Sequence, residues 1–224
     1  MEIFSSIQGE GLYAGVRQVF VRFFECNMHC IWCDTPHSIG DTARHFQEYT
    51  LDEVCRRIEE SGAGCHSVSL TGGEPLLQKD FLKTLSPSLK KMGLPSYLET
   101  NGTLYSELAE IIDEVDIIAM DMKLPSSTQC RAYWEEHAQF LKTALKKEVF
   151  VKTVISSQTQ PDDIDHCSAL IAGINPDVLL ILQPNSFDLG SGVVRKCLEF
   201  QNHCQKRLKH VRILPQIHRY LKLR

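Results

Sequence analysis

The regular alternation of short apolar runs with helix-length amphipathic segments is the feature of this sequence that most restricts its fold. The runs are rich in β-branched and aromatic residues and predict strands at residues 18–24, 66–73, 96–102, 116–123, 148–155, 177–184 and 211–214. Helical patterns between them cover residues 50–62, 79–92, 107–115, 132–146, 190–208 and a segment that begins near Pro161. Strands and helices that alternate in this way predict parallel βαβ units.

About six such units fit into the 224 residues. Because that number is too small for a closed eight-stranded barrel, we expect an α/β fold in which the units form a partial, incomplete TIM-type barrel. The chain has no low-complexity tract, fixed-period repeat or evident linker, and its length suits one domain with a large core. Residues 1–224 are therefore expected to form a single domain.

The balance of charge argues against nucleic acid as a partner. The chain carries 28 acidic and 24 basic side chains, a net charge of −4, so no overall positive field attracts a polyanion. No apolar run approaches the roughly 18 residues that a membrane-spanning helix needs. Nine cysteines, an odd number, follow no secretory signal pattern, which predicts free or metal-bound thiols in a reducing compartment. We expect a cytoplasmic protein with no membrane or nucleic-acid partner.

Three of the thiols lie close together in the segment FECNMHCIWCDT, at Cys26, Cys30 and Cys33. A structural zinc site needs four ligands, whereas three thiolates can hold three irons of a 4Fe-4S cluster and leave the fourth iron for an outside ligand. That ligand can be the amino and carboxylate groups of S-adenosylmethionine, whose reductive cleavage gives a 5′-deoxyadenosyl radical. Two alternatives stay open, namely incidental core thiols and a zinc site completed by His29 or His37.

Five polar or glycine-rich segments each follow a predicted strand directly. They are CNMHCIWCDT, TGGEP, ETNG, DMKLPSS and QPNS. Because the carboxyl ends of parallel strands meet at one rim of such a barrel, these segments are expected to form one site.

The three-cysteine spacing together with TGGEP resembles the radical S-adenosylmethionine superfamily. The segment EIFSSIQGEGLYAGVRQVFVRFFECNMHCIWCDT, with ETNGT, QPNS and RILPQIH further on, is similar to the 7-carboxy-7-deazaguanine synthase family over nearly the whole chain. The resemblance implies a radical carbon–nitrogen lyase that converts 6-carboxy-5,6,7,8-tetrahydropterin to 7-carboxy-7-deazaguanine with loss of ammonia, in the biosynthesis of queuosine and other deazapurines. It also implies three cofactors, which are a 4Fe-4S cluster, S-adenosylmethionine used catalytically, and Mg²⁺.

The resemblance implies roles for individual residues. Those of the pterin pocket are Ile7, Gln8, Gly9, Glu10, Arg22, Thr71 and His218. The planar fork of Arg22 would pair with the substrate carboxylate. The cluster would be held by Cys26, Cys30 and Cys33, and Mg²⁺ would be bound by the hydroxyl of Thr35. S-adenosylmethionine would contact Trp32, Cys33, Asp34, Gly73, Glu74, Asp121, Met122, Lys123, Gln183, Pro184, Asn185 and Ser186.

One of these segments departs from the family pattern. Where the family usually reads Ser-Pro-Lys, this chain has Asp121, Met122 and Lys123. Lys123 can still meet the cofactor carboxylate, and Ser126 or Ser127 can supply the missing hydroxyl. A structural pairing of Asp121 with Lys123 at the end of the strand is the alternative.

The resemblance further implies an external electron donor of the flavodoxin or ferredoxin type and a homodimer. Two other functions stay open at this point. One is another small radical enzyme, such as an activase that makes a glycyl radical on a partner protein, and the other is a non-enzymatic metal-binding or redox module. We expect little order without substrate in the loop from Pro36 to Tyr49, and a short first strand because the chain begins so close to the pocket.

Overall fold

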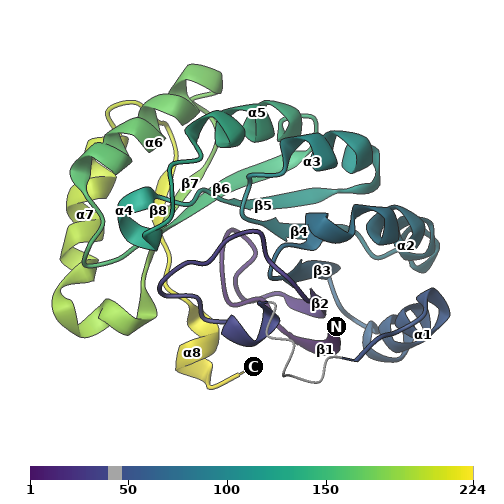
Figure 1. The fold of residues 1–224 in the computed structure, drawn as a ribbon. Coiled ribbons are helices and arrows are strands. Elements are labelled where there is room, and N and C mark those ends of the chain that lie inside the picture. Colours follow the sequence, from purple (N-terminus) through teal and green to yellow (C-terminus); the bar gives the residue numbers. More distant parts are fainter. Residues whose placement is uncertain (40–46, 224) are drawn as a thin grey trace.

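The computed structural model of this chain describes residues 1–39 and 47–223. Within these residues eight strands form one curved sheet in the order of the sequence (Figure 1). They are β1 Glu2–Ile7, β2 Arg17–Phe23, β3 Ser67–Gly72, β4 Ser96–Thr100, β5 Ile117–Asp121, β6 Glu148–Ile155, β7 Leu180–Pro184 and β8 Val211–Ile213. Strands β2 to β8 pair in parallel, and the sheet is open, with β1 and β8 at its edges. Residues 40–46 lie outside the described residues, so the expectation of little order in their loop stays a prediction.

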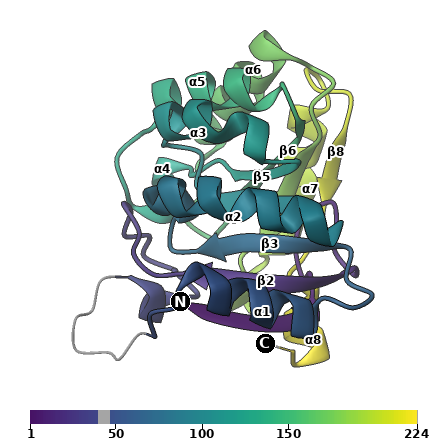
Figure 2. The same cartoon turned by 90° about the vertical axis from the view of Figure 1, so that its right-hand side faces the viewer.

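Helices follow the strands and cover the outer face of the sheet (Figures 1 and 2). The α-helices of the described residues are α1 Leu51–Ser61, α2 Lys79–Met92, α3 Tyr105–Ile111, α4 Pro125–Thr128, α5 Trp134–Ala144, α6 Pro161–Ile174, α7 Val193–Cys204 and α8 Ile217–Leu221. Short 3-10 helices occupy Pro36–Ser38, Pro75–Gln78, Ile112–Glu114 and Ser186–Ser191. None of the helices in residues 1–39 and 47–223 is both long and apolar enough to cross a membrane. The strand–helix units that run from β2 to α7 confirm the predicted partial TIM-type barrel.

Local hydrogen bonds set the start of these helices, and α1 shows how. The side chain of Thr50 accepts a hydrogen bond from the Glu53 N–H at 3.4 Å, and the Glu53 carboxylate accepts one from the Thr50 N–H at 2.8 Å. This reciprocal pair is a capping box, which satisfies donors that the first turn of a helix leaves unpaired. Because the sequence contains this capping signal, the predicted helix, residues 50–62, and the observed helix, Leu51–Ser61, agree within one residue at each end.

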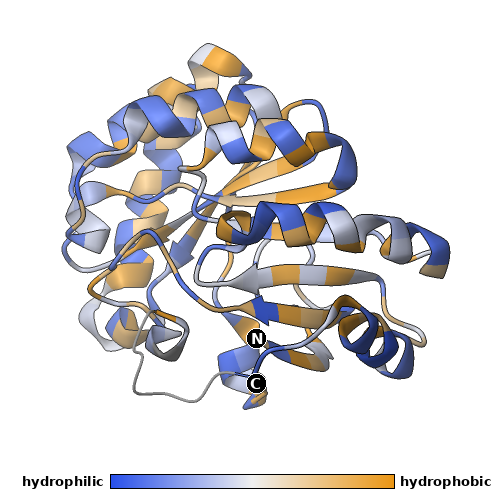
Figure 3. Ribbon diagram, turned by 45° about the vertical axis from the view of Figure 1, so that its right-hand side comes forward, coloured by the Kyte–Doolittle hydropathy of each residue, from blue (hydrophilic) through white to orange (hydrophobic). Residues whose placement is uncertain are grey.

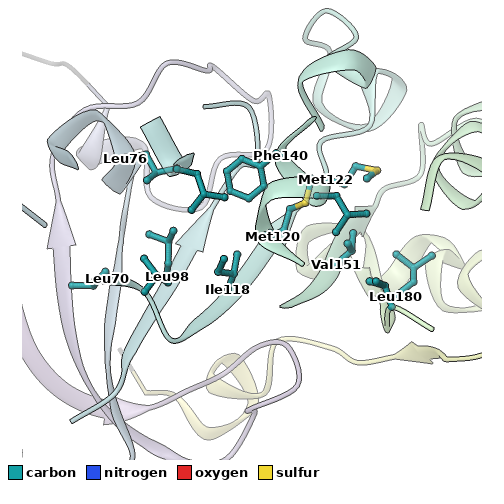
Figure 4. Packing of buried hydrophobic residues seen from close by; sticks show 14 of the residues in the cluster. Leu70, Leu76, Leu98, Ile118, Met120, Met122, Phe140, Val151 and Leu180 are labelled. Carbon is teal, nitrogen blue, oxygen red and sulfur yellow. The ribbon is translucent and has the colours of Figure 1, made fainter. Parts of the chain in front are cut away.

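The main hydrophobic core lies between the sheet and the helices. Figure 4 shows part of it, with Phe140 of α5 among the strand residues Leu98, Ile118 and Met120. Figure 3 shows apolar strands enclosed by helices that carry hydrophilic residues on their surface. Three cysteines that lie in helical patterns of the sequence pack here, two of them buried and one partly buried, namely Cys167, Cys197 and Cys55. Strands buried on both faces explain why their sequences read as continuous apolar runs.

A second, smaller cluster fills the inside of the barrel near the amino ends of the strands. It consists of Tyr97, Ile117, Ala119, Phe150 and Ile181. Gly11 packs against this cluster with φ +70°, and a Cβ at this position would lie 2.6 Å from the Phe150 ring. Because side chains fill this end, the space inside the barrel opens toward the carboxyl ends of the strands.

The first strand corrects the expectation that it would be short, and it lies outside the predicted parallel units. β1 has six residues and runs antiparallel to β2. The chain reverses between them through hydrogen bonds from Gln8 N–H to Val16 O and from Gly15 N–H to Gln8 O, both 2.8 Å long. Gly15 has φ +100°, a conformation that glycine adopts readily. The strand has a weak signal in the sequence because all its residues are partly exposed and mix serine with isoleucine, so no alternation marks it.

Candidate active site

A cavity of about 590 Å³ lies at the carboxyl ends of the strands. Each of the five segments predicted to share one rim contributes to its lining, for example through Cys26, Gly73, Asn101, Lys123 and Asn185. This volume lies within the range of roughly 300–1,000 Å³ that is typical of cavities that bind small molecules. The prediction that these segments form one site is confirmed by this convergence.

The cysteine loop follows β2 and is hydrogen-bonded to α4, the short helix that follows β5. The Ile31 N–H donates to Thr128 O at 3.0 Å, and the indole N–H of Trp32 donates to Ser127 O at 2.6 Å. Three free, partly exposed thiols of the loop line the cavity, those of Cys26, Cys30 and Cys33. The same loop also lines the cavity with Trp32, Asp34 and Thr35. All the loop residues to which the sequence analysis gave a role therefore line the same cavity.

The surroundings of the thiols suit a 4Fe-4S cluster. A Cβ on Gly73 would lie 1.9 Å from Glu25 O and 2.9 Å from the Cys26 Cβ, so glycine is required for the TGGEP turn to approach the cysteine loop this closely. Burial raises the pKa of Cys30 to about 12 and also raises the pKa of Cys26. These thiols therefore stay protonated until a metal displaces the proton, as thiolate ligation of iron requires.

The same geometry gives no support to a single-ion site. Within residues 1–39 and 47–223, no three side chains of His, Cys, Asp or Glu converge closely enough to share one metal ion. A 4Fe-4S cluster has no such requirement, because each thiolate binds a different iron. A zinc site completed by His29 is thus not formed, and the side chain of His37 lies outside the part of the chain that is described.

Glu74 lies in the TGGEP turn with its carboxylate directed into the protein. The carboxylate accepts hydrogen bonds from Leu76 N–H at 3.1 Å, Asn101 N–H at 2.8 Å and the Thr100 hydroxyl at 2.9 Å. Burial raises its pKa to about 7, against the effect of these hydrogen bonds. The Glu74 backbone N–H donates to Glu25 O at 2.8 Å. Its side chain joins the ends of β3 and β4, while its backbone holds the cysteine loop.

Four charged side chains form a continuous chain across the inside of the barrel. Lys152 contacts the carboxylate of Glu10 and, at 3.1 Å, that of Asp121. Lys123 contacts Asp121 at 2.9 Å, which is the structural pairing that the sequence left open. Burial alone would raise the pKa of Asp121, but the two lysines outweigh it and hold this pKa below its ordinary value.

Two buried acceptors in this region have no partner. Asp121 Oδ1 and Gln183 Oε1 make no hydrogen bond within the described chain, and both residues line the cavity. Since buried polar atoms are nearly always paired, these two oxygens are suited to accept hydrogen bonds from a ligand. The other residues of the two segments that line the cavity are Lys123, Asn185 and Ser186. By contrast, the side chain of Met122 lies in the main core, and Pro184 is buried in β7.

The loop between β1 and β2 supplies another part of the lining. Gln8 donates from Nε2 to Glu99 Oε1 at 2.9 Å, and its own Oε1 accepts from the Glu10 N–H at 3.0 Å. Burial, together with the negative charge of Glu10, raises the pKa of Glu99. These contacts fix the orientation of the Gln8 amide at the cavity wall.

Arg22 on β2 lies beside Thr71 on β3, and both residues line the cavity. The Arg22 guanidinium is 3.0 Å from a Glu2 carboxylate oxygen and 5.2 Å from the centre of the Phe4 ring. A guanidinium carries five N–H donors, so its contact with Glu2 leaves it able to bind an anionic group as well. A partly buried arginine in an apolar strand needs such partners.

Gly9 lies in the loop between β1 and β2, the first loop, and His218 lies in the segment after β8, the C-terminal segment. The two residues meet at the cavity. A Cβ on Gly9 would lie 1.9 Å from His218 Nδ1, so the close approach depends on glycine. Burial lowers the pKa of His218, although the carboxylates of Glu10 and Asp34 oppose this shift. Both residues line the cavity together with Ile7. The histidine therefore belongs to the cavity and is not a general surface residue.

Three further lining residues, Glu99, Lys152 and Gln216, carry no sequence-based assignment. Strand alternation contains the signal for two of them, because Lys152 shares a strand face with Phe150 and Glu99 shares one with Tyr97. Gln216 lies between β8 and α8, where no periodic pattern applies. Its role is visible only in the folded chain.

A partial βα barrel whose first parallel strand leads into a three-cysteine loop at a cavity defines a radical S-adenosylmethionine protein. The model of the Radical SAM superfamily matches residues 21–166. Over 240 aligned residues the chain is 41% identical to the 7-carboxy-7-deazaguanine synthase of Geobacter sulfurreducens, covering 98% of this chain and 95% of the relative. It is 34% identical to that of Archaeoglobus fulgidus, covering 100% and 98%. The chain belongs to the 7-carboxy-7-deazaguanine synthase family of this superfamily.

A solved structure supports the fold assignment. The crystal structure of QueE from Escherichia coli aligns with a TM-score of 0.65, covering 96% of this chain and 92% of that chain. The sequence identity in this alignment is 22%, so the likeness concerns the fold. It confirms the α/β partial-barrel fold predicted from the sequence.

Proposed function

We propose that this protein is a radical S-adenosylmethionine lyase that converts 6-carboxy-5,6,7,8-tetrahydropterin to 7-carboxy-7-deazaguanine with loss of ammonia. Its relationship to synthases of this name over nearly the whole chain supports the activity. The structural observation that carries the proposal is a cavity lined both by the three thiols and by Gln8, Glu10 and Arg22.

The cluster would be held by Cys26, Cys30 and Cys33. When bound, the cluster and S-adenosylmethionine supply an electron and a 5′-deoxyadenosyl radical. The unpartnered oxygens of Asp121 and Gln183 suit the amino and hydroxyl donors of that cofactor. Its carboxylate would be bound by a cation, for which Lys123 is the candidate because its Nζ lies 5.0 Å from the centre of the Trp32 ring in the cysteine loop.

The pterin would be held by charge and by amide hydrogen bonds. Arg22 would bind the substrate carboxylate as a two-pronged donor, which fixes the carbon that carries it. Burial alone would raise the pKa of Glu10, but Lys152 and a hydrogen bond from Gln216 bring it to about 2. Glu10 is therefore an anion and acts only as an acceptor, which suits the amino group of the pterin ring.

Magnesium is a further part of the proposal. The Thr35 side chain lines the cavity, and its hydroxyl is 3.9 Å from Cys33 Sγ. A hydroxyl is a hard oxygen ligand of the kind that Mg²⁺ accepts together with substrate oxygens and water. On this proposal Mg²⁺ would lie beside the cysteine loop.

We also propose the wider setting that the sequence and the family resemblance imply. It comprises a single domain over residues 1–224, a homodimer, a cytoplasmic location and reduction by a flavodoxin-like or ferredoxin-like protein. The free state of all nine cysteines supports a reducing compartment.

Binding of the pterin separates this function from the two alternatives. We expect the iron-loaded protein with S-adenosylmethionine to bind 6-carboxypterin at one saturable site in an anaerobic calorimetric titration. An activase of a partner protein, or a metal or redox module, has no use for such a site. Absence of saturable binding would therefore favour one of those alternatives.

A further inference from the structure

The C-terminal segment after β8 closes the open side of the barrel. Leu214 N–H donates to Leu182 O at 3.2 Å, which extends the pairing with β7, and Ile217 N–H donates to Gly9 O at 2.9 Å. The segment thus passes from one edge of the sheet to the loop beyond the other edge, as the yellow chain leading to α8 shows in Figure 1. A residue on this segment can touch both the first loop and the cysteine loop.

Gln216 makes both contacts with one side-chain amide. Its Nε2 donates to Glu10 Oε1 at 2.5 Å and to Asp34 Oδ2 at 2.9 Å. Its Oε1 accepts from Arg219 Nε at 3.2 Å, so the orientation of the amide is fixed. The residue is 7% exposed, and the carboxylates it joins are 206 and 182 residues away in the sequence. The contact is therefore a tertiary link made by a buried amide and not a local turn.

The two carboxylates belong to different parts of the site. Glu10 lies in the first loop, next to Gln8 and Gly9, and its other oxygen contacts Lys152. Asp34 lies in the cysteine loop directly after Cys33. Two carboxylates repel each other, whereas an amide with two N–H donors holds both without adding charge. Gln216 thus links the first loop to the cysteine loop.

We propose that Gln216 is a positioning residue. It holds the first loop, which is expected to bind the pterin, at a fixed place relative to the cysteine loop. This inference rests on the proposed function and deepens it. Its action is indirect, because the amide touches Glu10 and Asp34 and not the reacting atoms. Without the Gln216 amide, the buried side of Glu10 and the partly exposed Asp34 carboxylate each lose a donor, Asp34 keeps only Arg219 at 3.7 Å among the described residues, and the two loops move apart. Pterin binding then weakens, and radicals are formed more often without conversion of the pterin.

The test compares three variants. Gln216→Met keeps the length of the side chain and removes both donors, and Gln216→Asn keeps the amide but is too short to reach both carboxylates. Gln201→Met is the matched control, because the Gln201 amide donates to Val211 O at 2.9 Å and anchors β8 without touching the site. Each protein is measured anaerobically for 6-carboxypterin affinity by calorimetry, iron per chain, and the ratio of 7-carboxy-7-deazaguanine to 5′-deoxyadenosine.

We expect both Gln216 variants to bind 6-carboxypterin about tenfold more weakly, the effect of one charge-assisted hydrogen bond, and to give a lower product ratio. Iron per chain and 5′-deoxyadenosine formed without pterin should match the unaltered protein, and Gln201→Met should change neither affinity nor ratio. Unchanged affinity and ratio in the Gln216 variants would overturn the inference. So would an equal loss in Gln201→Met, which would mark a general effect on the C-terminal segment. If the unaltered protein binds no carboxypterin, the proposed function fails instead.

Discussion

The carboxylate of Asp121 and the ammonium of Lys152 lie 3.1 Å apart inside the barrel and join β5 to β6. This contact links the residues expected to bind S-adenosylmethionine to Glu10 in the first loop. It also explains how the chain tolerates Asp121 at a position where the family resemblance leads us to expect serine. A buried carboxylate needs compensation, and here two lysines provide it.

Removing the cation at Lys152 should destabilise the fold. Lys152→Met leaves Glu10 without its ammonium partner and Asp121 with only Lys123, so we expect a loss of about 3 kcal/mol in the free energy of unfolding. Chemical denaturation of the iron-free protein measures this loss. Lys142→Met, at an exposed position of α5, is the control and should change the free energy by less than about 0.5 kcal/mol. A loss no larger than that of the control would show that the buried ion pairs are energetically neutral.

Arg22 should be needed for the pterin and not for the cluster. Because Arg22→Ala removes the guanidinium expected on the substrate carboxylate, kcat/KM for the carboxypterin should fall about 100-fold or more. Iron content and cleavage of S-adenosylmethionine without pterin should be retained. Arg17→Ala, at the exposed start of the same strand, is the matched control. Loss of the iron signal in Arg22→Ala would mean that the residue is structural.

Each of the three loop cysteines should be indispensable for the cluster. Cys26→Ala, Cys30→Ala and Cys33→Ala each leave one iron without its thiolate, so we expect loss of the visible iron–sulfur absorption and of both activities. Cys55→Ala, at a partly buried position of α1, should keep the cluster. Retention of a full complement of iron and sulfide by any of the three loop variants would contradict this assignment.

Glu99 should make stability depend on pH. Burial and the charge of Glu10 raise its pKa above the ordinary value of 4.5, so its contribution to stability is present below that value and is lost as the pH rises through the folded-state pKa. Glu99→Gln cannot ionise, and its amide oxygen can keep the bonds from Ser69 at 2.6 Å and Gln8 at 2.9 Å. The variant should therefore gain stability relative to the parent between about pH 5 and pH 8. Denaturant titrations measure the difference in the free energy of unfolding between Glu99→Gln and the parent. The same difference at about pH 5 and about pH 8 would refute this prediction.

The sequence predicts the parallel strands and the rim of this protein well, for identifiable reasons. The parallel strands are buried on both faces, so runs such as 148–155 stand out, and each motif follows its strand directly. β1 lacks this signal because it is partly exposed on an edge. Contacts such as that of Gly9 with His218 depend on how the C-terminal segment crosses to the first loop, which no local pattern encodes.

The most direct test of the account is one anaerobic reaction of iron- and sulfide-reconstituted protein with reductant, S-adenosylmethionine, Mg²⁺ and 6-carboxy-5,6,7,8-tetrahydropterin, with products identified by mass spectrometry. The account predicts 7-carboxy-7-deazaguanine together with released ammonia. Formation of 5′-deoxyadenosine with the pterin unchanged would contradict the assigned substrate, although the superfamily assignment would stand.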